Sequence, residues 1–313
     1  MTTQHPSPPP RGAPPGDVVV TDALAADLLA AQAPALLPLP RHVAAQGWDN
    51  VMIRLGADLA MRLPRRAVAA ELVLVEQRWL PALAPALPVR VPTPLVRGVA
   101  QAGYPYPWSV VPWLPGVPAA TLMSGGTRVG TGDDEEPWAR DLAAVLAALH
   151  RPAPADAPHN PVRAVPLAGR AASIRERIER IGADWAVPIL DAGVGAPRHD
   201  GVPRWVHGDP HPGNVLLGEA GELAALVDFG DLSAGDPACD LAAAWLHFGP
   251  SGRAAFRRRY DDLVPRHREG RWERAAAWAL AMACAVVEQA PDDPTNRGWA
   301  DAALDSLRTD APG

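Results

Sequence analysis

Two short stretches of this sequence hold the residue types and spacing that could perform chemistry. Residues 205–217 read WVHGDPHPGNVLL, and DFGD follows at 228–231. Asp209 and Asn214 lie five positions apart, and the prolines and glycine between them exclude a regular helix. We therefore expect a rigid loop that carries Asp209 and Asn214, with Asp228 further along the chain.

These residues suit the transfer of a phosphoryl group, a reaction whose catalysis consists mainly of positioning and charge neutralisation. Asp209 can orient and deprotonate an attacking hydroxyl, while Asn214 and Asp228 offer the hard oxygen atoms that Mg²⁺ prefers. Protein kinases arrange the same residue types as H-R-D-x-x-x-x-N followed by D-F-G, and this chain has H-G-D-P-H-P-G-N and a DFG. Asp231, beside the DFG, we interpret as an ordinary solvated charge.

The two histidines of the loop allow a different interpretation. His207 and His211 form an H-x-D-x-H pattern that, with Asp228, could ligate Zn²⁺ or a pair of metal ions. That interpretation gives Asn214 no function, so phosphoryl transfer explains more of the motif. We expect His211 to pack or to form hydrogen bonds within the loop.

A β-hairpin is the element that would bring these separated residues together. The apolar run 215–217 and the strand pattern 223–229 flank a turn of Gly, Glu, Ala and Gly. Pairing of the two strands would place Asn214 close to Asp228.

The first third of the chain predicts a small sheet. Strand patterns within 51–63, at 95–100 and at 108–114 surround one helical pattern at 67–80, which indicates a sheet with one helix over about residues 40–112.

The rest of the chain is predicted from helix signals. Asp22 is expected to cap a short helix that runs through Leu29. After Leu241 the pattern is helical, and the apolar run 275–287 predicts a buried helix, since a membrane span needs roughly 20 residues.

Three motifs in order resemble one known family. They are HGDPHPGN at 207–214, VDFGD at 227–231 and GDPACDLA at 235–242, and they are similar to motifs of the aminoglycoside phosphotransferase and choline kinase family. The resemblance extends from about Gly47 to the C-terminal helices. It implies an α+β, two-lobe protein-kinase-like fold, with a small N-terminal β-sheet lobe that has one helix and a larger helical C-terminal lobe.

The expected domain organisation has three parts. Residues 1–16 are Pro-rich and predict a disordered tail. Residues 17–112 would form the nucleotide-binding lobe, and residues 113–313 would form the catalytic and substrate-binding lobe.

The resemblance also implies roles for single residues of the C-terminal lobe. Asp209 would be the catalytic aspartate that faces the substrate hydroxyl. Asn214 and Asp228 would hold Mg²⁺ on the phosphates of ATP or GTP. Supporting residues would be His207, His211, Asp236 and Asp240.

In the N-terminal lobe the sequence departs from the family pattern. Glu76 matches the glutamate that pairs with a phosphate-binding lysine, but the lysine position falls at Arg62, and all 29 basic residues of this chain are arginine. Arginine keeps its charge and has a forked head, so Arg62 can still contact phosphates. The hinge from Val111 to Leu114, including Val111 and Trp113, would bind the purine through its backbone.

Net charge and composition limit the kinds of partner that this chain is expected to bind. A net charge of −6 argues against nucleic acid as the main partner, because phosphate backbones need a basic face. The two cysteines are far apart, and neither a secretion signal nor a membrane-length apolar run is present, so we expect a cytoplasmic protein without a membrane partner.

The predicted function is a nucleotide-dependent kinase that phosphorylates a hydroxyl of a small molecule, an aminoglycoside- or macrolide-like antibiotic. Two alternatives stay open at this point. One is a kinase of a metabolic amino alcohol or sugar, choline- or homoserine-like. The other is a nucleotide-binding regulator without turnover.

Overall fold

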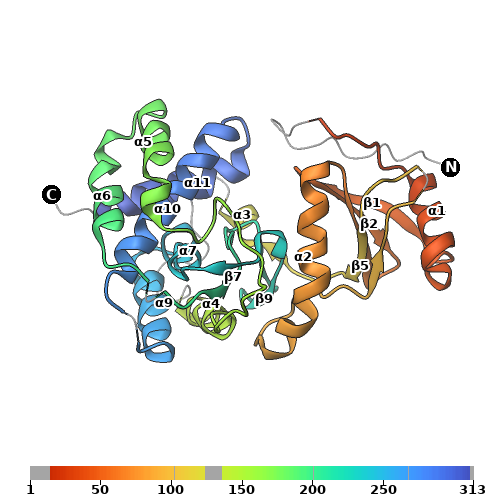
Figure 1. The fold of residues 1–313 in the computed structure, drawn as a ribbon, viewed down its shortest axis with the longest axis horizontal. Helices are drawn as coiled ribbons and strands as arrows, with labels where there is room; N and C mark the ends of the chain where they lie inside the picture. The colour runs from red at the N-terminus through yellow and green to blue at the C-terminus, as the bar shows by residue number, and fades with distance from the viewer. Residues whose placement is uncertain (1–14, 102, 124–135, 200, 267, 311–313) are drawn as a thin grey trace. The chain divides into compact units, whose positions relative to one another are not determined.

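The computed structural model describes residues 15–101, 103–123, 136–199, 201–266 and 268–310. The predicted tail lies outside this part of the chain except for Pro15 and Gly16. The chain forms two compact units (Figure 1). The N-terminal unit comprises Met1–Pro85 and Val91–Leu114, and the C-terminal unit comprises Ala86–Arg90 and Pro115–Gly313.

A five-stranded antiparallel sheet forms the centre of the N-terminal unit, with strand order β1-β2-β3-β5-β4. The strands are β1 (Arg41–Gln46), β2 (Asn50–Leu55), β3 (Leu59–Pro64), β4 (Val96–Gly98) and β5 (Trp108–Pro112). The strands predicted within 51–63, at 95–100 and at 108–114 are confirmed. The sequence does not predict β1, because RHVAAQ lacks the β-branched and aromatic residues typical of strands except for one valine.

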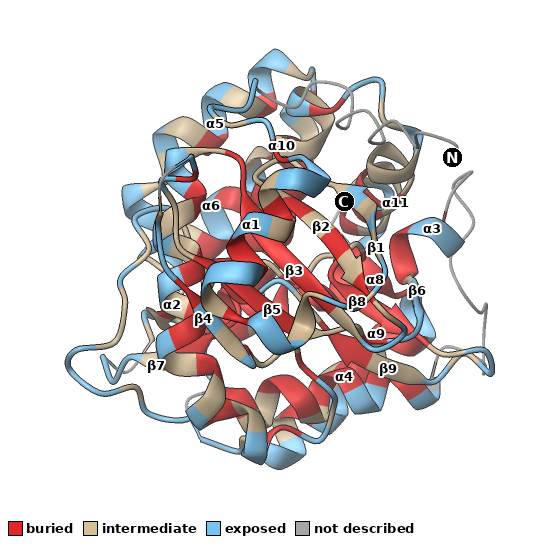
Figure 2. Cartoon of the chain, turned by 90° about the vertical axis from the view of Figure 1, so that its right-hand side faces the viewer, coloured by how far each residue is buried: buried red, intermediate tan, exposed pale blue. Residues whose placement is uncertain are grey.

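The strand register gives the sheet one apolar face. Ile53 pairs with Met61, and Met61 pairs with Val110, so these side chains point to the same side. There they pack in one core with Leu28 and Leu29 of α1 (Asp22–Gln32). Figure 2 shows the buried residues following the central strands of this sheet.

The opposite face of the sheet carries polar residues. Arg62 and Ser109 are direct register partners on this face, and α2 (Ala67–Leu83) covers it. Gln77 of α2 donates from Nε2 to the carbonyl oxygen of Trp108 at 2.7 Å and to Ser109 Oγ at 3.1 Å. Helices α1 and α2 therefore lie on opposite sides of the sheet (Figure 1).

The start of α1 corrects one prediction. Thr21, not Asp22, caps this helix, because the Thr21 backbone is extended and its Oγ1 accepts from the Leu24 amide at 3.1 Å. Asp22 is the first helical residue, where a negative charge interacts favourably with the helix dipole.

Helices make up most of the C-terminal unit, as predicted. The longer ones are α4 (Glu136–Leu149), α5 (Ala171–Arg180), α6 (Val187–Gly195), α9 (Pro250–Leu263), α10 (Arg271–Gln289) and α11 (Pro294–Asp310), and the shorter ones are α3 (Ala119–Leu122), α7 (Ala238–Leu241) and α8 (Ala243–His247). Helix α10 is the buried helix predicted from the apolar run, and it packs against α5, α6, α7, α8 and α11. None of the helices in the described part of the chain is long and apolar enough to cross a membrane.

Short strands of the C-terminal unit flank the loops that carry the predicted site residues. Strands β6 (Val117–Pro118), β8 (Val215–Leu217) and β9 (Leu223–Leu226) form one sheet, and β7 (Arg204–Val206) pairs with β10 (Ser233–Gly235). The predicted β8–β9 hairpin is confirmed. Its second strand ends at Leu226, short of the predicted end at Phe229, because Asp228 turns into the left-handed region with φ of 61°.

Candidate active site

The catalytic loop, residues 207–214, connects β7 to β8 and depends on a glycine. Gly208 has a φ of +88°, and a Cβ at this position would lie 2.6 Å from the carbonyl oxygen of Asp231. A side chain here would be strained and would collide with backbone. The loop therefore packs tightly on the turn 229–231.

The hairpin assembles the three residues that the sequence singled out for chemistry. The Val227 amide donates to the carbonyl oxygen of Asn214 at 2.9 Å, and Asp228 is the next residue. The Asn214 side chain donates from Nδ2 to the carbonyl oxygen of Asp209 at 2.9 Å. Asp209, Asn214 and Asp228 thus belong to one connected loop system, in which Asp228 holds a backbone conformation that non-glycine residues seldom adopt.

Arg163 contacts Asp209 directly, although no motif of the sequence reveals it. Its Nη2 donates to Asp209 Oδ1 at 3.0 Å, and both side chains are 24% exposed. Its Nε lies 3.9 Å from Asp231 Oδ2. Burial lowers the pKa of Arg163, but the charges of Asp209 and Asp231 outweigh it and raise the pKa overall. The arginine therefore stays charged and holds the Asp209 carboxylate in one orientation.

Asp231 is held in place, so its interpretation as an ordinary solvated charge is wrong. Asn160 Nδ2 donates to Asp231 Oδ1 at 2.7 Å. Burial raises the pKa of Asp231, and the charges of Asp209 and Asp228 raise it further, while Arg163 and Asn160 oppose them. Negative charge is thus concentrated at this end of the hairpin, an environment that a divalent cation would stabilise.

Asp240 ties down the start of the catalytic loop. This fully buried carboxylate accepts from the amides of His207 at 2.7 Å and Gly208 at 2.8 Å. It is also 3.0 Å from His150 Nε2, and His150 Nδ1 lies 2.7 Å from the Tyr260 hydroxyl. Its contacts therefore come from two distant parts of the chain, which suits the supporting role predicted for Asp240.

His207 and His211 form hydrogen bonds within the loop and also contact neighbouring elements. The Nε2 atom of His207 lies 3.0 Å from the Val227 carbonyl oxygen, and its Nδ1 accepts weakly from the Asp209 amide at 3.3 Å. His211 Nδ1 accepts from the Gly213 amide at 2.9 Å, and its ring stacks on Trp299.

These contacts argue against the zinc interpretation, because the His207 nitrogens and one His211 nitrogen already form hydrogen bonds. Among the described residues, moreover, no group of three or more His, Cys, Asp or Glu side chains is arranged to hold a metal ion. Asn214 and Asp228 could bind Mg²⁺ only with further oxygen ligands, which nucleotide phosphates characteristically supply.

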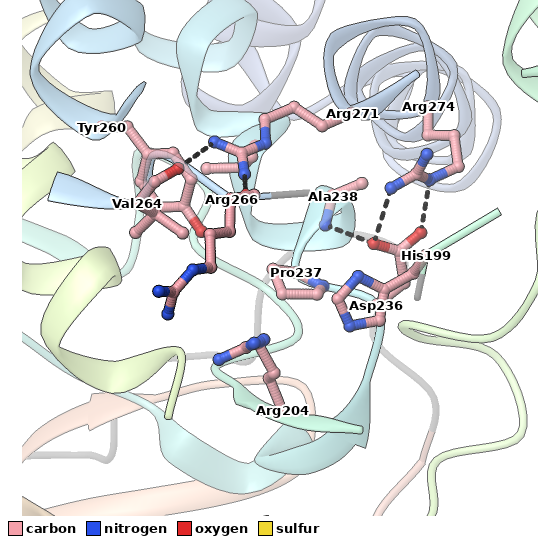
Figure 3. A pocket seen from close by; sticks show the side chains of 11 residues that line it. His199, Arg204, Asp236, Pro237, Ala238, Tyr260, Val264, Arg266, Arg271 and Arg274 are labelled. Atoms are coloured by element: carbon pink, nitrogen blue, oxygen red, sulfur yellow. Dashed lines mark hydrogen bonds and ion pairs between the residues drawn. The ribbon is translucent and has the colours of Figure 1, made fainter. Parts of the chain in front are cut away.

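Asp236 anchors the segment that follows the hairpin. It accepts from Arg274 Nε of α10 at 2.7 Å and from the Ala238 amide at 3.0 Å (Figure 3). Its own amide donates to the Ala164 carbonyl oxygen at 2.9 Å. Because Ala164 follows Arg163, Asp236 also fixes the backbone from which Arg163 reaches Asp209.

In the N-terminal unit, Arg62 of β3 and Glu76 of α2 form a buried ion pair. Arg62 Nη1 donates to Glu76 Oε1 at 2.6 Å, and the two side chains are 8% and 3% exposed. The pairing predicted for these residues is present in the structure. The sheet face described above therefore carries a guanidinium group with a fixed orientation.

Val111 and Trp113, predicted to face a purine through their backbone, lie at and just after the end of β5. Val111 is buried and pairs with Ala60. The Trp113 amide donates to the Asp58 carbonyl oxygen at 2.7 Å, and the Arg54 guanidinium lies over the Trp113 ring. Both residues are thus held by neighbouring strands of the same sheet.

Several residues that complete the site escape prediction because they are far from the motifs in sequence. They are His150, Asn160, Arg163, Tyr260 and Arg274. The sequence around these residues gives no local signal of their positions in the site.

The chain is similar to known proteins both in sequence and in structure. A sequence model of the Phosphotransferase enzyme family matches residues 41–303 of this chain. None of the curated proteins matches it.

Solved structures with a similar fold include kinases of two antibiotic classes. The GDP complex of wild-type aminoglycoside 2'-phosphotransferase-IIIa has 17% sequence identity and a TM-score of 0.67, over 93% of this chain and 99% of that one. Macrolide 2'-phosphotransferase type I has 22% identity and a TM-score of 0.59, over 93% and 98%. Macrolide 2'-phosphotransferase MphH from Brachybacterium faecium has 23% identity and a TM-score of 0.56, over 94% and 99%. At these identities the comparison establishes a shared fold.

Proposed function

This chain belongs to the phosphotransferase enzyme family, and we propose that it transfers the γ-phosphate of ATP or GTP to a hydroxyl of an aminoglycoside- or macrolide-like small molecule. The observation that carries this proposal is the hairpin that connects Asp209, Asn214 and Asp228. Phosphoryl transfer requires a group that positions the hydroxyl and oxygen ligands for a metal–nucleotide complex. These three residues supply both.

Asp209 orients the attacking hydroxyl and accepts its proton. It is partly exposed, so a substrate can reach it. Arg163 holds one carboxylate oxygen, Oδ1, and leaves the second one, Oδ2, which lies 3.7 Å from His211 Nε2, to accept from the substrate hydroxyl. Since phosphoryl transfer has a largely dissociative transition state, this positioning contributes more than strong basicity would.

The residues present fit a Mg²⁺ ion carried by the nucleotide. Asn214 and Asp228 offer an amide and a carboxylate oxygen. Burial contributes most to the raised pKa of Asp231, and the charges of Asp209 and Asp228 add to it, which agrees with a cluster of carboxylates at this end of the hairpin. When bound, Mg²⁺ neutralises the charge on the phosphates. The hydrogen bond that Asn214 Nδ2 donates to the Asp209 carbonyl oxygen leaves the Asn214 side-chain oxygen to bind the metal.

The nucleotide is held by the N-terminal unit. Arg62 contacts its phosphates while Glu76 keeps the guanidinium oriented, and the backbone from Val111 to Trp113 binds the base. Neighbouring structures of the same fold are complexes with GDP and with ATP, which supports testing both donors on this chain.

One observation favours a macrolide-like acceptor over a polycationic aminoglycoside. Recognition of a polycation needs carboxylates that are available to its ammonium groups. Here Arg163 already occupies Asp209, and Arg177 and Arg180 both donate to Glu288. These two carboxylates are therefore less available to the ammonium groups of a polycation.

A transfer assay tests the proposal. The purified protein is incubated with Mg²⁺, with ATP or GTP, and with aminoglycosides, macrolides and amino alcohols in separate reactions, and products are identified by mass spectrometry. We expect an acceptor that gains one phosphate, only with Mg²⁺ present and with macrolides ahead of aminoglycosides. Absence of a phosphorylated product from every acceptor with both donors would overturn the proposal.

A further inference from the structure

A narrow pocket in the C-terminal unit carries more positive than negative charge. It measures about 20 Å³. Its charged and titratable lining includes His199, Arg204, Asp236, Arg266, Arg271 and Arg274. Four arginines and one carboxylate thus meet in one small space.

Two of the four arginines are neutralised by partners. Arg274 Nε is 2.7 Å from Asp236 Oδ2. Arg271 Nη1 is 2.8 Å from Asp261 Oδ1 and also donates to the Val264 carbonyl oxygen. These pairs form the wall of the pocket and leave no carboxylate of the lining for another cation.

The other two arginines are not neutralised within the described part of the chain. Arg204 Nη1 donates to the carbonyl oxygen of His150 at 3.3 Å, a neutral acceptor. The Arg266 side chain forms neither a hydrogen bond nor an ion pair with any described residue. Figure 3 shows the Arg266 side chain extending downward and the Arg204 side chain extending upward, with both guanidinium groups on the same side of Pro237.

We propose that this pocket binds a phosphate group, either inorganic phosphate or the phosphate of a monoester. Such a group carries a charge of about −1.5 to −2 at neutral pH and three strong acceptor oxygens, which matches the two unbalanced guanidinium charges. Arginine forks bind oxyanions of this geometry through paired hydrogen bonds. A carboxylate would balance only one of the two charges.

The size of the pocket limits what enters it. At about 20 Å³ the pocket has room for about one or two water-sized groups, because a single water needs about 10–15 Å³. One or two phosphate oxygens therefore enter between the guanidinium groups, and the rest of the phosphate, with any ester group, stays at the mouth of the pocket.

The position of the pocket couples it to the catalytic loop. Arg204 contacts the His150 backbone, and the His150 side chain contacts Asp240. Asp240 in turn accepts the amides of His207 and Gly208. A phosphate that immobilises Arg204 would restrain this chain of contacts and make the start of the catalytic loop more rigid.

Calorimetric titration with inorganic phosphate, without nucleotide or acceptor, tests the site at constant ionic strength. We expect Arg266→Gln and Arg204→Gln each to weaken phosphate binding by about tenfold or more, the usual scale for removing a charged hydrogen bond. Arg259→Gln is the matched control, because it removes one exposed arginine of the same unit outside the pocket. Glycerol phosphate and acetate are titrated in parallel to separate a monoester, free phosphate and a carboxylate.

The outcomes decide the proposal. Weakening by both pocket variants but not by Arg259→Gln supports the site, as does slower hydrogen exchange at the amides of His207 and Gly208 when phosphate is bound. Absence of phosphate binding to the unaltered protein, equal weakening by Arg259→Gln, or acetate binding as tightly as phosphate would overturn it. Melting curves of each variant show whether it is folded. Because the titration contains no nucleotide, its result is independent of the proposed kinase activity.

Discussion

Two arginine–carboxylate pairs, one in each unit, differ in how far water reaches them. In the N-terminal unit, Arg62 and Glu76 are 2.6 Å apart, with side chains 8% and 3% exposed. In the C-terminal unit, Arg163 and Asp209 are 3.0 Å apart, and both are 24% exposed. The first pair is enclosed by a helix and a sheet, whereas the second lies on a loop.

This difference in solvent exposure suits the two pairs to different functions. A buried pair cannot lose one partner without leaving an unneutralised charge in a low-dielectric interior, so it serves as a fixed scaffold. A partly exposed pair can replace one of its contacts by a contact with water or substrate at little cost in free energy. Asp209 can therefore present an oxygen to a hydroxyl, while Glu76 remains committed to Arg62.

Breaking the buried pair should have the largest effect on stability. Glu76→Ala leaves Arg62 charged and buried, and we expect a loss of about 3–5 kcal/mol in the free energy of unfolding. Urea unfolding followed by circular dichroism measures it. Glu71→Ala, at an exposed position of the same helix, is the control and should change stability by less than about 0.5 kcal/mol.

A double variant sharpens this test. Replacing both members, as in Arg62→Met with Glu76→Leu, should restore most of the stability, because the apolar pair leaves no buried charge. Nucleotide use should nevertheless remain lost if Arg62 contacts phosphate. Normal nucleotide affinity in the double variant would remove Arg62 from the proposed site.

The second pair should show the reverse pattern, with a large effect on turnover and a small one on stability. Asp209→Asn keeps the shape of the side chain but removes the proton acceptor, and we expect the turnover number to fall by about 10²-fold or more. Nucleotide affinity should stay within about twofold, since Asp209 contacts the acceptor hydroxyl and not the nucleotide in the proposed reaction. Asp262→Asn, at an exposed position of α9, is the control, and full turnover by Asp209→Asn would exclude Asp209 as the catalytic residue.

Arg163 should have an intermediate effect, because it acts through Asp209. For Arg163→Gln we expect the turnover number to fall by about tenfold, the scale of one charged hydrogen bond at a partly exposed site. Arg163→Lys should recover part of the loss, and Arg151→Gln, which removes an exposed arginine, should change nothing. A fall in stability without a fall in turnover would make Arg163 a structural residue only.

The distance between residues along the chain determines which parts of the site a single sequence can predict. The residues of the catalytic loop and of the hairpin are close in sequence, so their spacing predicts that Asp209, Asn214 and Asp228 are connected. Arg163 reaches Asp209, and His150 reaches Asp240, across long stretches of chain, and nothing local marks either contact. In the same way, the residue patterns of β2 and β3 predict those strands. The sequence of β1 has little preference for a strand, and β1 is held by its pairing with β2.

A third ion-pair group, at the surface of the C-terminal unit, should have the smallest effect and makes the comparison quantitative. Hydrogen bonds from Arg180 and then from Arg177 lower the pKa of Glu288 from its ordinary value of 4.5 to about 2. Because the folded-state pKa is lower than the unfolded one, the stabilisation is present above about pH 4.5 and is lost as the pH falls towards 2.

Glu288→Gln should therefore be less stable than the parent protein at pH 7 by no more than about 1 kcal/mol, since the group is largely at the surface. The difference should shrink steadily between pH 4.5 and pH 2, as measured by urea unfolding across that range, with Glu219→Gln as the control that removes an exposed carboxylate of the same unit. A difference as large as that of Glu76→Ala would mean that exposure does not set the strength of these pairs. A difference that persists at pH 2 would show that Glu288 stabilises the fold by packing and not by its charge.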